Sequence, residues 1–148
     1  MTLSKTAIAS FDVDAQKSFT PLCPNELPVV GGDQIGAELN YMASLVGHRI
    51  GSKDAHTPNA PWVVQQQSDM MQATGLEHAD LTWVSHCVPG TPGFELLDEL
   101  RFERAKQLLA EKHHAIYQIA EELGFSESAS FRHAFQRWSG VPPSQFRH

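Results

Sequence analysis

Apolar residues recur at helical spacing through the last third of the chain, residues 116–147. A first stripe at positions i, i+3, i+4 and i+7 predicts a short helix that ends at Gly124, where a left-handed residue is favoured. A second stripe at i, i+4 and i+7 predicts a further helix, capped by Ser126 and stopped by Pro142 and Pro143. The two stripes are formed by Ile116, Ile119, Ala120 and Leu123, and by Phe131, Phe135 and Trp138.

The polar residues of the second predicted helix lie off its apolar stripe and would face outward. Two short helices around a glycine turn form the helix-turn-helix arrangement, whose second helix enters the DNA major groove. No acidic residue follows Glu127. The pattern therefore predicts contacts with double-stranded DNA, and a two-helix packing module with a solvated basic face is the alternative. The predicted contact residues are Ser128, Ser130, Arg132, His133, Gln136 and Arg137.

The first half of the chain has the pattern of an α/β protein. Residues 6–13 form an apolar run that ends at Asp14, as a buried parallel strand does when it places a carboxylate at its end. An amphipathic helix is predicted over residues 34–45, and a weaker strand over residues 46–52 precedes Asp54. The order strand, helix, strand indicates a βαβ unit with a parallel sheet.

The junction between the two halves lacks the usual features of a linker. Apolar positions keep one helical phase from Leu97 to Leu108, so a helix is predicted over residues 94–111. Independent domains normally meet at a segment rich in proline, glycine or polar residues. We therefore expect two domains, residues 1–98 and 99–148, that share one helix.

Charge is distributed unevenly between these regions, and it changes what each could bind. The net charge is −6. Residues 1–98 carry four Lys/Arg and eleven Asp/Glu, a balance of −7, whereas residues 99–148 carry seven and six, a balance of +1. Only the C-terminal region is therefore suited to a polyanion.

The two cysteines and the absence of long apolar runs bear on location. Cys23 and Cys87 form no disulfide framework and no Cys-x-x-Cys pair, which is typical of a reducing cytoplasm. The sequence has no charged-then-apolar leader and no run of ~18 apolar residues. A cytoplasmic protein without a membrane span is expected.

The stretch from about Arg101 to Arg147 resembles the C-terminal part of the AraC/XylS-type DNA-binding domain. The matching runs are R-x-x-x-A-x-x-L-L from Arg101, I-x-x-I-A-x-x-L-G-F from Ile116 and F-x-x-x-F-x-x-W-x-G-x-x-P-x-x-F-R from Phe131. That domain has two helix-turn-helix units joined by a long helix, and the matching residues are the joining helix and the second unit. The resemblance implies a transcriptional regulator that binds double-stranded DNA. Because one helix-turn-helix unit has a small footprint, binding is expected to be weak and salt-sensitive unless the chain forms a homodimer.

Three residues of the first half have the character of metal ligands. Asp54 and His56 form a D-x-H pair in a loop after a predicted strand, and His86 lies in a later turn. A carboxylate and two imidazoles suit Zn, Fe or Mn, with water in the open positions. The alternative is that these loop side chains bind the backbone.

Three motifs within about residues 5–98 resemble those of the nicotinamidase/isochorismatase-like cysteine hydrolases. They are V-D-x-Q-x-x-F (13–19), S-K-D-x-H (52–56) and W-x-x-H-C-V-x-G-T-P-G (83–93). The resemblance implies a partial parallel-sheet α/β region with a catalytic acid/base and one divalent metal. The acid/base would be Asp14, and the metal ligands would be Asp54, His56 and His86.

This hydrolase-like region is expected to be truncated and inactive. The nucleophilic cysteine and catalytic lysine of the resembled family follow the last of the three motifs, and no cysteine follows Cys87 here. Without a positioned thiolate there is no covalent step for amide hydrolysis. Four interpretations stay open: a DNA-binding regulator, a metal-dependent amide hydrolase, a metal- or ligand-sensing half joined to a DNA-binding half, and a product of gene fusion near residues 97–101.

Overall fold

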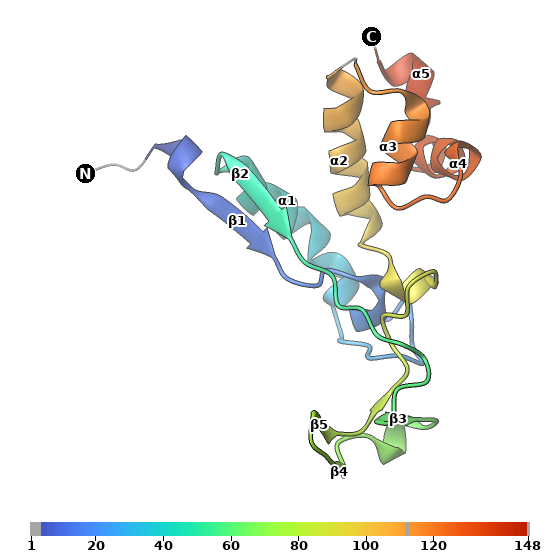
Figure 1. Cartoon of the computed structure of the whole chain (residues 1–148). Helices are drawn as coiled ribbons and strands as arrows, with labels where there is room; N and C mark the ends of the chain where they lie inside the picture. Colours follow the sequence, from blue (N-terminus) through green and yellow to red (C-terminus); the bar gives the residue numbers. More distant parts are fainter. Residues whose placement is uncertain (1–3, 112, 148) are drawn as a thin grey trace. The chain divides into compact units, whose positions relative to one another are not determined.

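The computed structural model describes residues 4–111 and 113–147 (Figure 1). The chain divides into two compact units, one ending at Leu97 and the other beginning at Asp98. Among the described residues, no helix is both long and apolar enough to cross a bilayer.

The first unit begins with a strand, a helix and a strand in the predicted order. β1 (Ala9–Asp12) and β2 (His48–Gly51) pair in parallel, and α1 (Gly36–Ser44) lies between them in the sequence. The register places Phe11 beside Ile50. Arg49 donates from Nε to Asp12 Oδ2 over 2.6 Å, so an ion pair also joins the two strands.

The prediction that the first strand is buried is wrong. The side chains of Phe11 and Ile50 are 60% and 55% exposed, and Met42 on α1 is 47% exposed. A buried parallel strand needs neighbours on both sides and helices on both faces. Here β1 and β2 form a sheet of only two strands, which leaves their apolar side chains in solvent.

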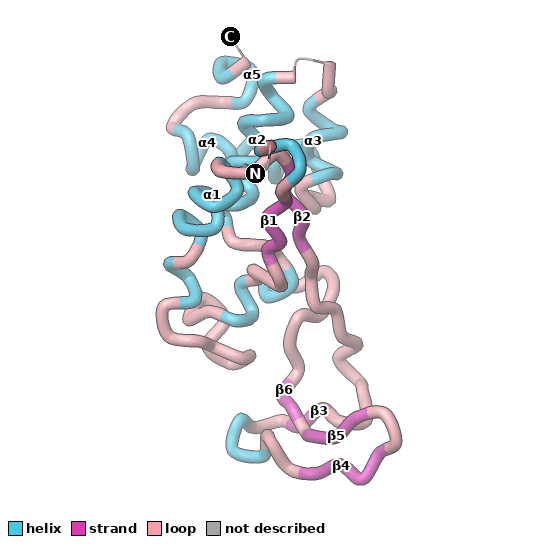
Figure 2. The backbone as a smooth tube through the Cα atoms, turned by 90° about the vertical axis from the view of Figure 1, so that its left-hand side faces the viewer, coloured by secondary structure: helices cyan, strands magenta, loops and turns pink. Residues whose placement is uncertain are grey.

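The rest of the first unit is mostly loop, as the tube in Figure 2 shows. β3 (Val63–Val64) pairs in parallel with β6 (Trp83–Val84), and β4 (Ala73–Leu76) pairs with β5 (Ala79–Leu81) as an antiparallel hairpin. Short 3-10 helices occupy Lys5–Ala7, Lys17–Phe19, Gly32–Gln34, Gln67–Asp69 and Pro92–Phe94.

The second unit is a cluster of helices around one apolar core. Its helices are α2 (Asp98–Ala110), α3 (Ile116–Glu122), α4 (Ser128–Ser139) and α5 (Pro143–Phe146). The core contains both predicted stripes and residues of α2, because each helix turns its apolar face inward. Its buried members are Ala105, Leu108, Leu109, Ile119, Ala120, Phe131 and Phe135.

The turn between α3 and α4 explains why this pair of helices was predictable. Gly124 is left-handed, with φ of 78°. Its N–H donates to the carbonyl of Glu121 over 2.9 Å, and the N–H of Phe125 donates to that of Ala120 over 2.8 Å. This pair of bonds is the Schellman motif, which closes a helix end and needs a left-handed residue. The predicted cap is wrong by one residue, because α4 is preceded by Glu127 and not by Ser126.

The predicted helix over residues 94–111 is also wrong at its start. Glu95 is extended, with ψ of 143°, and α2 begins only at Asp98. The carbonyl of Glu95 accepts from the N–H of Lys17, and the N–H of Leu97 donates to Ala15. These strand-like bonds to a distant segment hold the backbone extended, although the side-chain pattern fits a helix.

Candidate nucleic-acid interface and candidate metal centre

The outward surface of α4 carries the predicted DNA-contacting residues. Its core side contains Phe131, Ala134 and Phe135, all buried. Ala129, His133 and Gln136 follow at i, i+4 and i+7 on the opposite side, since such spacing stacks residues along one helix face. Five of the six predicted residues are exposed: Ser130, Arg132, His133, Gln136 and Arg137, whereas Ser128 is half-buried.

The polar side chains on this surface have no partners within the part of the chain that the structure describes. No hydrogen bond or ion pair is formed there by the side chains of Arg132, His133, Gln136 or Arg137. α4 contains no acidic residue that could neutralise its arginines. The positive charge and hydrogen-bonding groups of this surface are therefore open to a ligand. We call these four residues, together with Ser128 and Ser130, the α4 outer face.

The other arginines of the second unit are used within the fold. Arg101 is 5% exposed, and its guanidinium carbon lies 4.0 Å from the centre of the Phe125 ring. This contact holds Phe125, in the turn after α3, against α2, because a guanidinium stacks favourably on an aromatic face. Trp138 donates from Nε1 to Asp98 Oδ2 over 3.2 Å, which fixes the far end of α4 to the start of α2.

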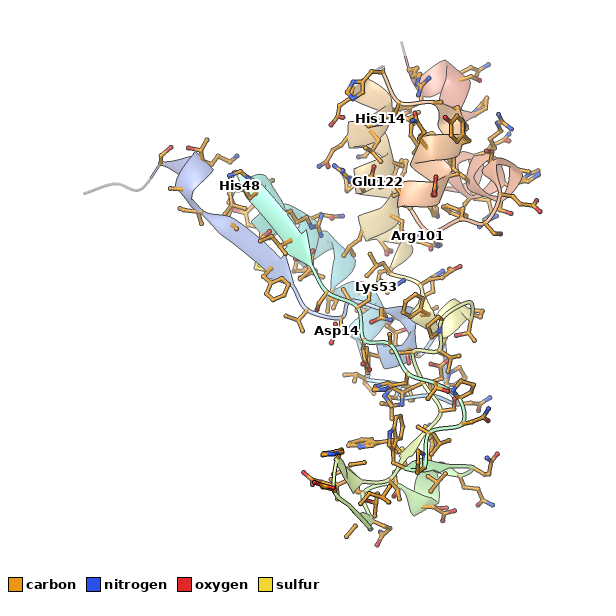
Figure 3. The ribbon with its side chains drawn as sticks, viewed as in Figure 1. Asp14, His48, Lys53, Arg101, His114 and Glu122 are labelled. Atoms are coloured by element: carbon orange, nitrogen blue, oxygen red, sulfur yellow. The ribbon has the colours of Figure 1, made fainter. Side chains whose placement is uncertain are left out.

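Two further arginines tie helices and loops together near the surface, and Figure 3 labels their partners, Glu122 and His114. Arg104 on α2 donates from Nε to Oε1 of Glu122 on α3 over 2.9 Å. Arg147, after α5, donates to the carbonyl of His114 between α2 and α3. These contacts show that Arg101, Arg104 and Arg147 support the fold. The two arginines of α4 have no such contacts among the described residues, so their positive charge is available to a ligand.

In the first unit, the predicted metal ligands Asp54, His56 and His86 lie close together. His56 Nε2 lies 2.9 Å from Asp54 Oδ1, and His86 Nε2 lies 3.5 Å from Asp54 Oδ2. One donor atom from each of the three residues lies within 4.8 Å of the other two. Donors at about 2.1 Å from one ion are roughly 3 to 3.5 Å apart in tetrahedral geometry, so these residues fit a divalent metal.

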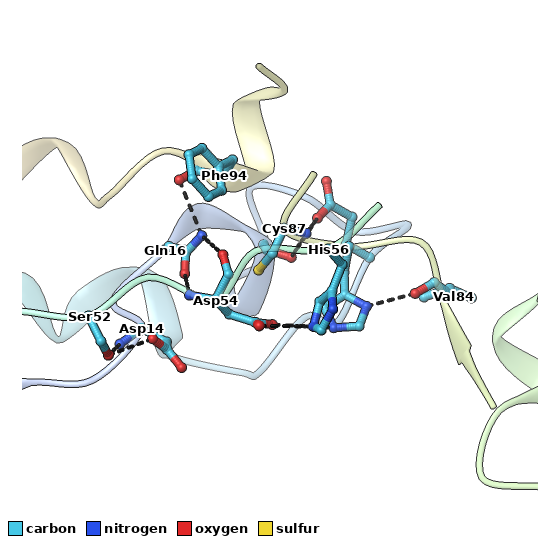
Figure 4. Close-up of polar contacts among 11 residues, drawn as sticks. Asp14, Gln16, Ser52, Asp54, His56, Val84, Cys87 and Phe94 are labelled. Atoms are coloured by element: carbon cyan, nitrogen blue, oxygen red, sulfur yellow. Dashed lines mark hydrogen bonds and ion pairs between the residues drawn. The ribbon is translucent and has the colours of Figure 1, made fainter. Parts of the chain in front are cut away.

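The backbone around Asp54 is held by a buried side chain (Figure 4). Gln16 is 1% exposed. Its Oε1 accepts from the N–H of Asp54 over 2.6 Å, and its Nε2 donates to the carbonyls of Asp54 and Phe94 over 3.0 and 3.2 Å. The Gln16 amide thus satisfies both backbone groups of Asp54. The carboxylate of Asp54 lies beside His56 and His86.

The histidines are oriented by their own contacts. His86 Nδ1 donates to the carbonyl of Val84 over 2.7 Å, which leaves Nε2 with a free lone pair directed at Asp54. The backbone N–H of His56 donates to the backbone carbonyl of Cys87 over 3.2 Å. The rings of His56 and His86 lie 4.6 Å apart between centroids, with Trp62 packed beside both. An oriented imidazole with one free nitrogen is the arrangement that metal ligation requires.

Asp14 is held by a different partner. It is left-handed, with φ of 50°, and Ser52 Oγ donates to its Oδ1 over 2.7 Å. Figure 4 shows this pair separated from the bonds between Asp54 and His56. Burial raises the pKa of the Cys87 thiol to about 11, with a smaller contribution from the charges of Asp54 and Glu26. The thiol is therefore protonated at neutral pH and is no nucleophile.

Sequence reasoning missed the roles of Gln16, Trp62 and Arg101. Gln16 was within the V-D-x-Q-x-x-F run, but nothing in its spacing showed that its amide would bind the backbone of Asp54. Arg101 was counted among the positive charges, although it is buried against Phe125. These roles depend on contacts between residues far apart in the sequence, so spacing along one segment contains no signal for them.

Comparison with known proteins places the similarity in the C-terminal part of the chain. A family model described as a helix-turn-helix domain matches residues 71–148. The HTH-type transcriptional regulator VqsM of Pseudomonas aeruginosa is 45% identical over 36% of this chain and 16% of its own length. The ornithine utilization regulator of the same organism is 41% identical over 39% of this chain and 17% of its own length.

A third relative comes from a different bacterium. The raffinose operon transcriptional regulatory protein RafR of Pediococcus pentosaceus is 42% identical over 36% of this chain and 19% of its own length. The chain thus spans less than a fifth of the length of these three curated relatives.

Proposed function

Because the chain belongs to the AraC-type helix-turn-helix family, we propose that its second unit binds double-stranded DNA and that the protein regulates transcription. The observation that carries this proposal is the α4 outer face, on which exposed arginines have no partner among the described residues while other arginines of the unit do. The relatives named as transcriptional regulators support it.

The residue types on the α4 outer face suit recognition of a duplex in its major groove. Arg132 and Arg137 contact phosphates or guanine edges, since a guanidinium matches both geometries. Gln136 can bind an adenine edge with both amide atoms, and His133 lies beside it on the same face. Ser128 and Ser130 are at the start of α4, where a recognition helix meets bases and phosphates.

One helix-turn-helix unit has a small footprint, and the first unit repels DNA because its four Lys/Arg and ten Asp/Glu give a balance of −6. We therefore propose weak, salt-sensitive binding by one chain and tighter binding by a homodimer that spans two half-sites. Such half-sites would be separated by about one helical turn of DNA, or a multiple of it.

The test is fluorescence anisotropy with a mixed-sequence duplex at low salt, using the full chain. Replacing Arg132→Ala and Arg137→Ala together should weaken binding about tenfold or more and reduce the slope of log K against log salt by about 2, because each phosphate contact contributes close to 0.9. The matched control is Arg104→Ala, which also removes a positive charge but whose partner is Glu122.

Two outcomes would contradict the proposal in different ways. Absence of any shift on any duplex at low salt would contradict DNA binding itself. Equal losses from the α4 variant and from Arg104→Ala would instead show that only net charge matters, and would contradict the assignment of the α4 outer face.

We also propose that the first unit is a truncated region of the isochorismatase-like type that holds one divalent metal and does not catalyse amide hydrolysis. The distances among Asp54, His56 and His86 support a site for Zn, Fe or Mn. Asp14 would be a remnant of a catalytic acid/base. In this proposal the metal stabilises the loops that carry its ligands.

Metal analysis of the purified chain tests this second proposal. Bound metal is expected to fall by one equivalent in His86→Ala and to stay unchanged in His78→Ala; His78 is an exposed histidine outside the site. Absence of metal at micromolar free ion would contradict the site. Release of ammonia from nicotinamide with added metal, abolished by Asp14→Ala, would contradict the claim of inactivity.

A further inference from the structure

We infer that the corner between α2 and α3 is a second site for a transition-metal ion, formed by Glu111, His113 and His114. One donor atom from each residue lies within 4.8 Å of the other two. These residues are in the second unit, so the site is separate from the one formed by Asp54, His56 and His86. The inference does not depend on DNA binding.

The donor atoms converge on one carboxylate oxygen. His114 Nε2 lies 2.8 Å and His113 Nε2 lies 3.7 Å from Oε2 of Glu111. Two donors at about 2.1 Å from a tetrahedral ion are roughly 3.4 Å apart, and the two distances lie on either side of that value. Small rotations of the three side chains would therefore place all three donors around one ion.

The orientation of His113 is the one that a ligand needs. Its Nδ1 donates to the carbonyl of Glu111 over 2.7 Å. A carbonyl only accepts, so this bond fixes the proton on Nδ1 and leaves a lone pair on Nε2. Ligating histidines commonly donate their second nitrogen to a backbone carbonyl in this way. Here the carbonyl belongs to the residue that supplies the carboxylate.

The corner is supported from both sides. The N–H of Glu111 donates to the carbonyl of Gln107 over 3.2 Å, so Glu111 still belongs to the hydrogen-bonded end of α2. The carbonyl of His114 accepts from Arg147. Gln118 on α3 accepts from the N–H of Ala115 over 2.8 Å. Glu111 is thereby joined to α2, Ala115 to α3, and His114 to the segment after α5.

The chemistry of the donors selects the class of ion. Two imidazole nitrogens and one carboxylate suit Zn²⁺, Ni²⁺ or Cu²⁺ and not Mg²⁺ or Ca²⁺, which prefer oxygen ligands. The side chain of His113 is 72% exposed, so an ion enters from solvent and keeps at least one water. A bound ion would link the end of α2 to the start of α3 and stabilise the helix cluster.

The test is equilibrium dialysis of the full chain against Zn²⁺ in a background that lacks the first site, His56→Ala with His86→Ala. We expect about one equivalent of bound Zn²⁺ at micromolar free ion. Adding His113→Ala and His114→Ala should weaken binding at least tenfold, because loss of ligating side chains lowers metal affinity by more than loss of their supporting partners, which costs about 10–100-fold. Adding His78→Ala in place of the pair should leave binding unchanged.

A second measurement guards against variants that fail to fold. Far-UV circular dichroism should show the same helix content in all variants without metal, and Zn²⁺ should raise the Tm only where His113 and His114 are present. The inference is overturned if the background chain binds no Zn²⁺ below millimolar concentration, or if binding survives removal of His113 and His114. If the His113→Ala, His114→Ala pair alters helix content, His113→Gln with His114→Gln takes its place and must weaken Zn²⁺ binding by the same factor of ten.

Discussion

Residues 98–147 bury large apolar side chains, whereas residues 4–97 bury mainly small and polar ones. The fully buried side chains of the second unit include Phe131, Phe135 and Ile119, while those of the first include Gln16 and Thr20. Thirteen of the sixteen exposed large apolar side chains among the described residues belong to the first unit. The second unit is therefore held by the hydrophobic effect, and the first depends on hydrogen bonds and leaves much of its apolar surface in water.

The comparison shows where each unit is vulnerable. A core of interlocked aromatic rings fails when one ring is removed, because the cavity cannot collapse fully. A network of buried hydrogen bonds fails when one partner is removed, because the groups left behind have neither a protein partner nor access to water. Variants that act on one kind of support should therefore affect one unit and spare the other.

The largest effect is expected from Phe135→Ala in the second unit. Removal of a fully buried phenylalanine costs about 3–5 kcal/mol, which is comparable with the whole stability of a unit this small at about 0.05–0.15 kcal/mol per residue. Loss of helical far-UV circular dichroism would report it. The matched variant Phe11→Ala in the first unit, 60% exposed, should cost about 0.5 kcal/mol. A comparable cost for Phe11→Ala would show that the apolar face of β1 is covered in solution.

The next largest effect is expected from Gln16→Ala. The change leaves the part-buried N–H and C=O of Asp54 without their partner, at up to about 1–3 kcal/mol for each group. Hydrogen exchange at the Asp54 amide should accelerate while amides of α4 stay protected. The control is Gln67→Ala, an exposed glutamine that also donates to two carbonyls, those of Pro24 and Glu26. Equal effects of the two substitutions would contradict the importance of burial.

A smaller effect is expected from Gly124→Ala. A Cβ at this position would meet no atom within 4 Å, so the cost comes only from the left-handed backbone. That cost is about 1 kcal/mol. Urea unfolding of the second unit measures it, and Gly124→Asn should cost less because asparagine tolerates this conformation. A loss of several kcal/mol would indicate a steric contact that the structure does not contain.

The smallest effect is expected from Arg104→Ala. Its ion pair with Glu122 joins α2 to α3, but both side chains are about half exposed. Such pairs contribute about 0.2–1 kcal/mol and less in high salt. A double-mutant cycle with Glu122→Ala isolates the pair. A coupling that persists unchanged at high salt would contradict the assignment of this contact to the solvent-exposed surface.

The second unit could be predicted well from the sequence because its determinants are local. Each apolar stripe repeats within one helix, and Gly124 marks a turn whose two hydrogen bonds lie within six residues. The outward direction of Arg132, His133, Gln136 and Arg137 followed from the same periodicity. The cap was placed at Ser126 because side-chain preference alone was considered, whereas the backbone enters the helix at Glu127.

The first unit was predicted less well because its determinants are distant. An apolar run indicates a buried strand only if other strands and helices cover it, and residues 9–12 have one strand neighbour. The start of α2 depends on the bonds of Glu95 and Leu97 to residues 15–17. The residue types of Asp54, His56 and His86 indicated a metal site, and the structure brings the three side chains together, but spacing gave no sign of the amide that holds Asp54.

The way Gln16 holds Asp54 has an evolutionary consequence. The amide binds the N–H and C=O of residue 54 and leaves its side chain uninvolved. These bonds to the backbone do not require a particular side chain at position 54, so a mutation there changes the donor set and leaves the bonds from Gln16 available. Asp54→Cys would add a soft sulfur donor beside two imidazoles, and Asp54→His a third nitrogen. The preference of such a site for one ion over another could thus change in a single mutational step.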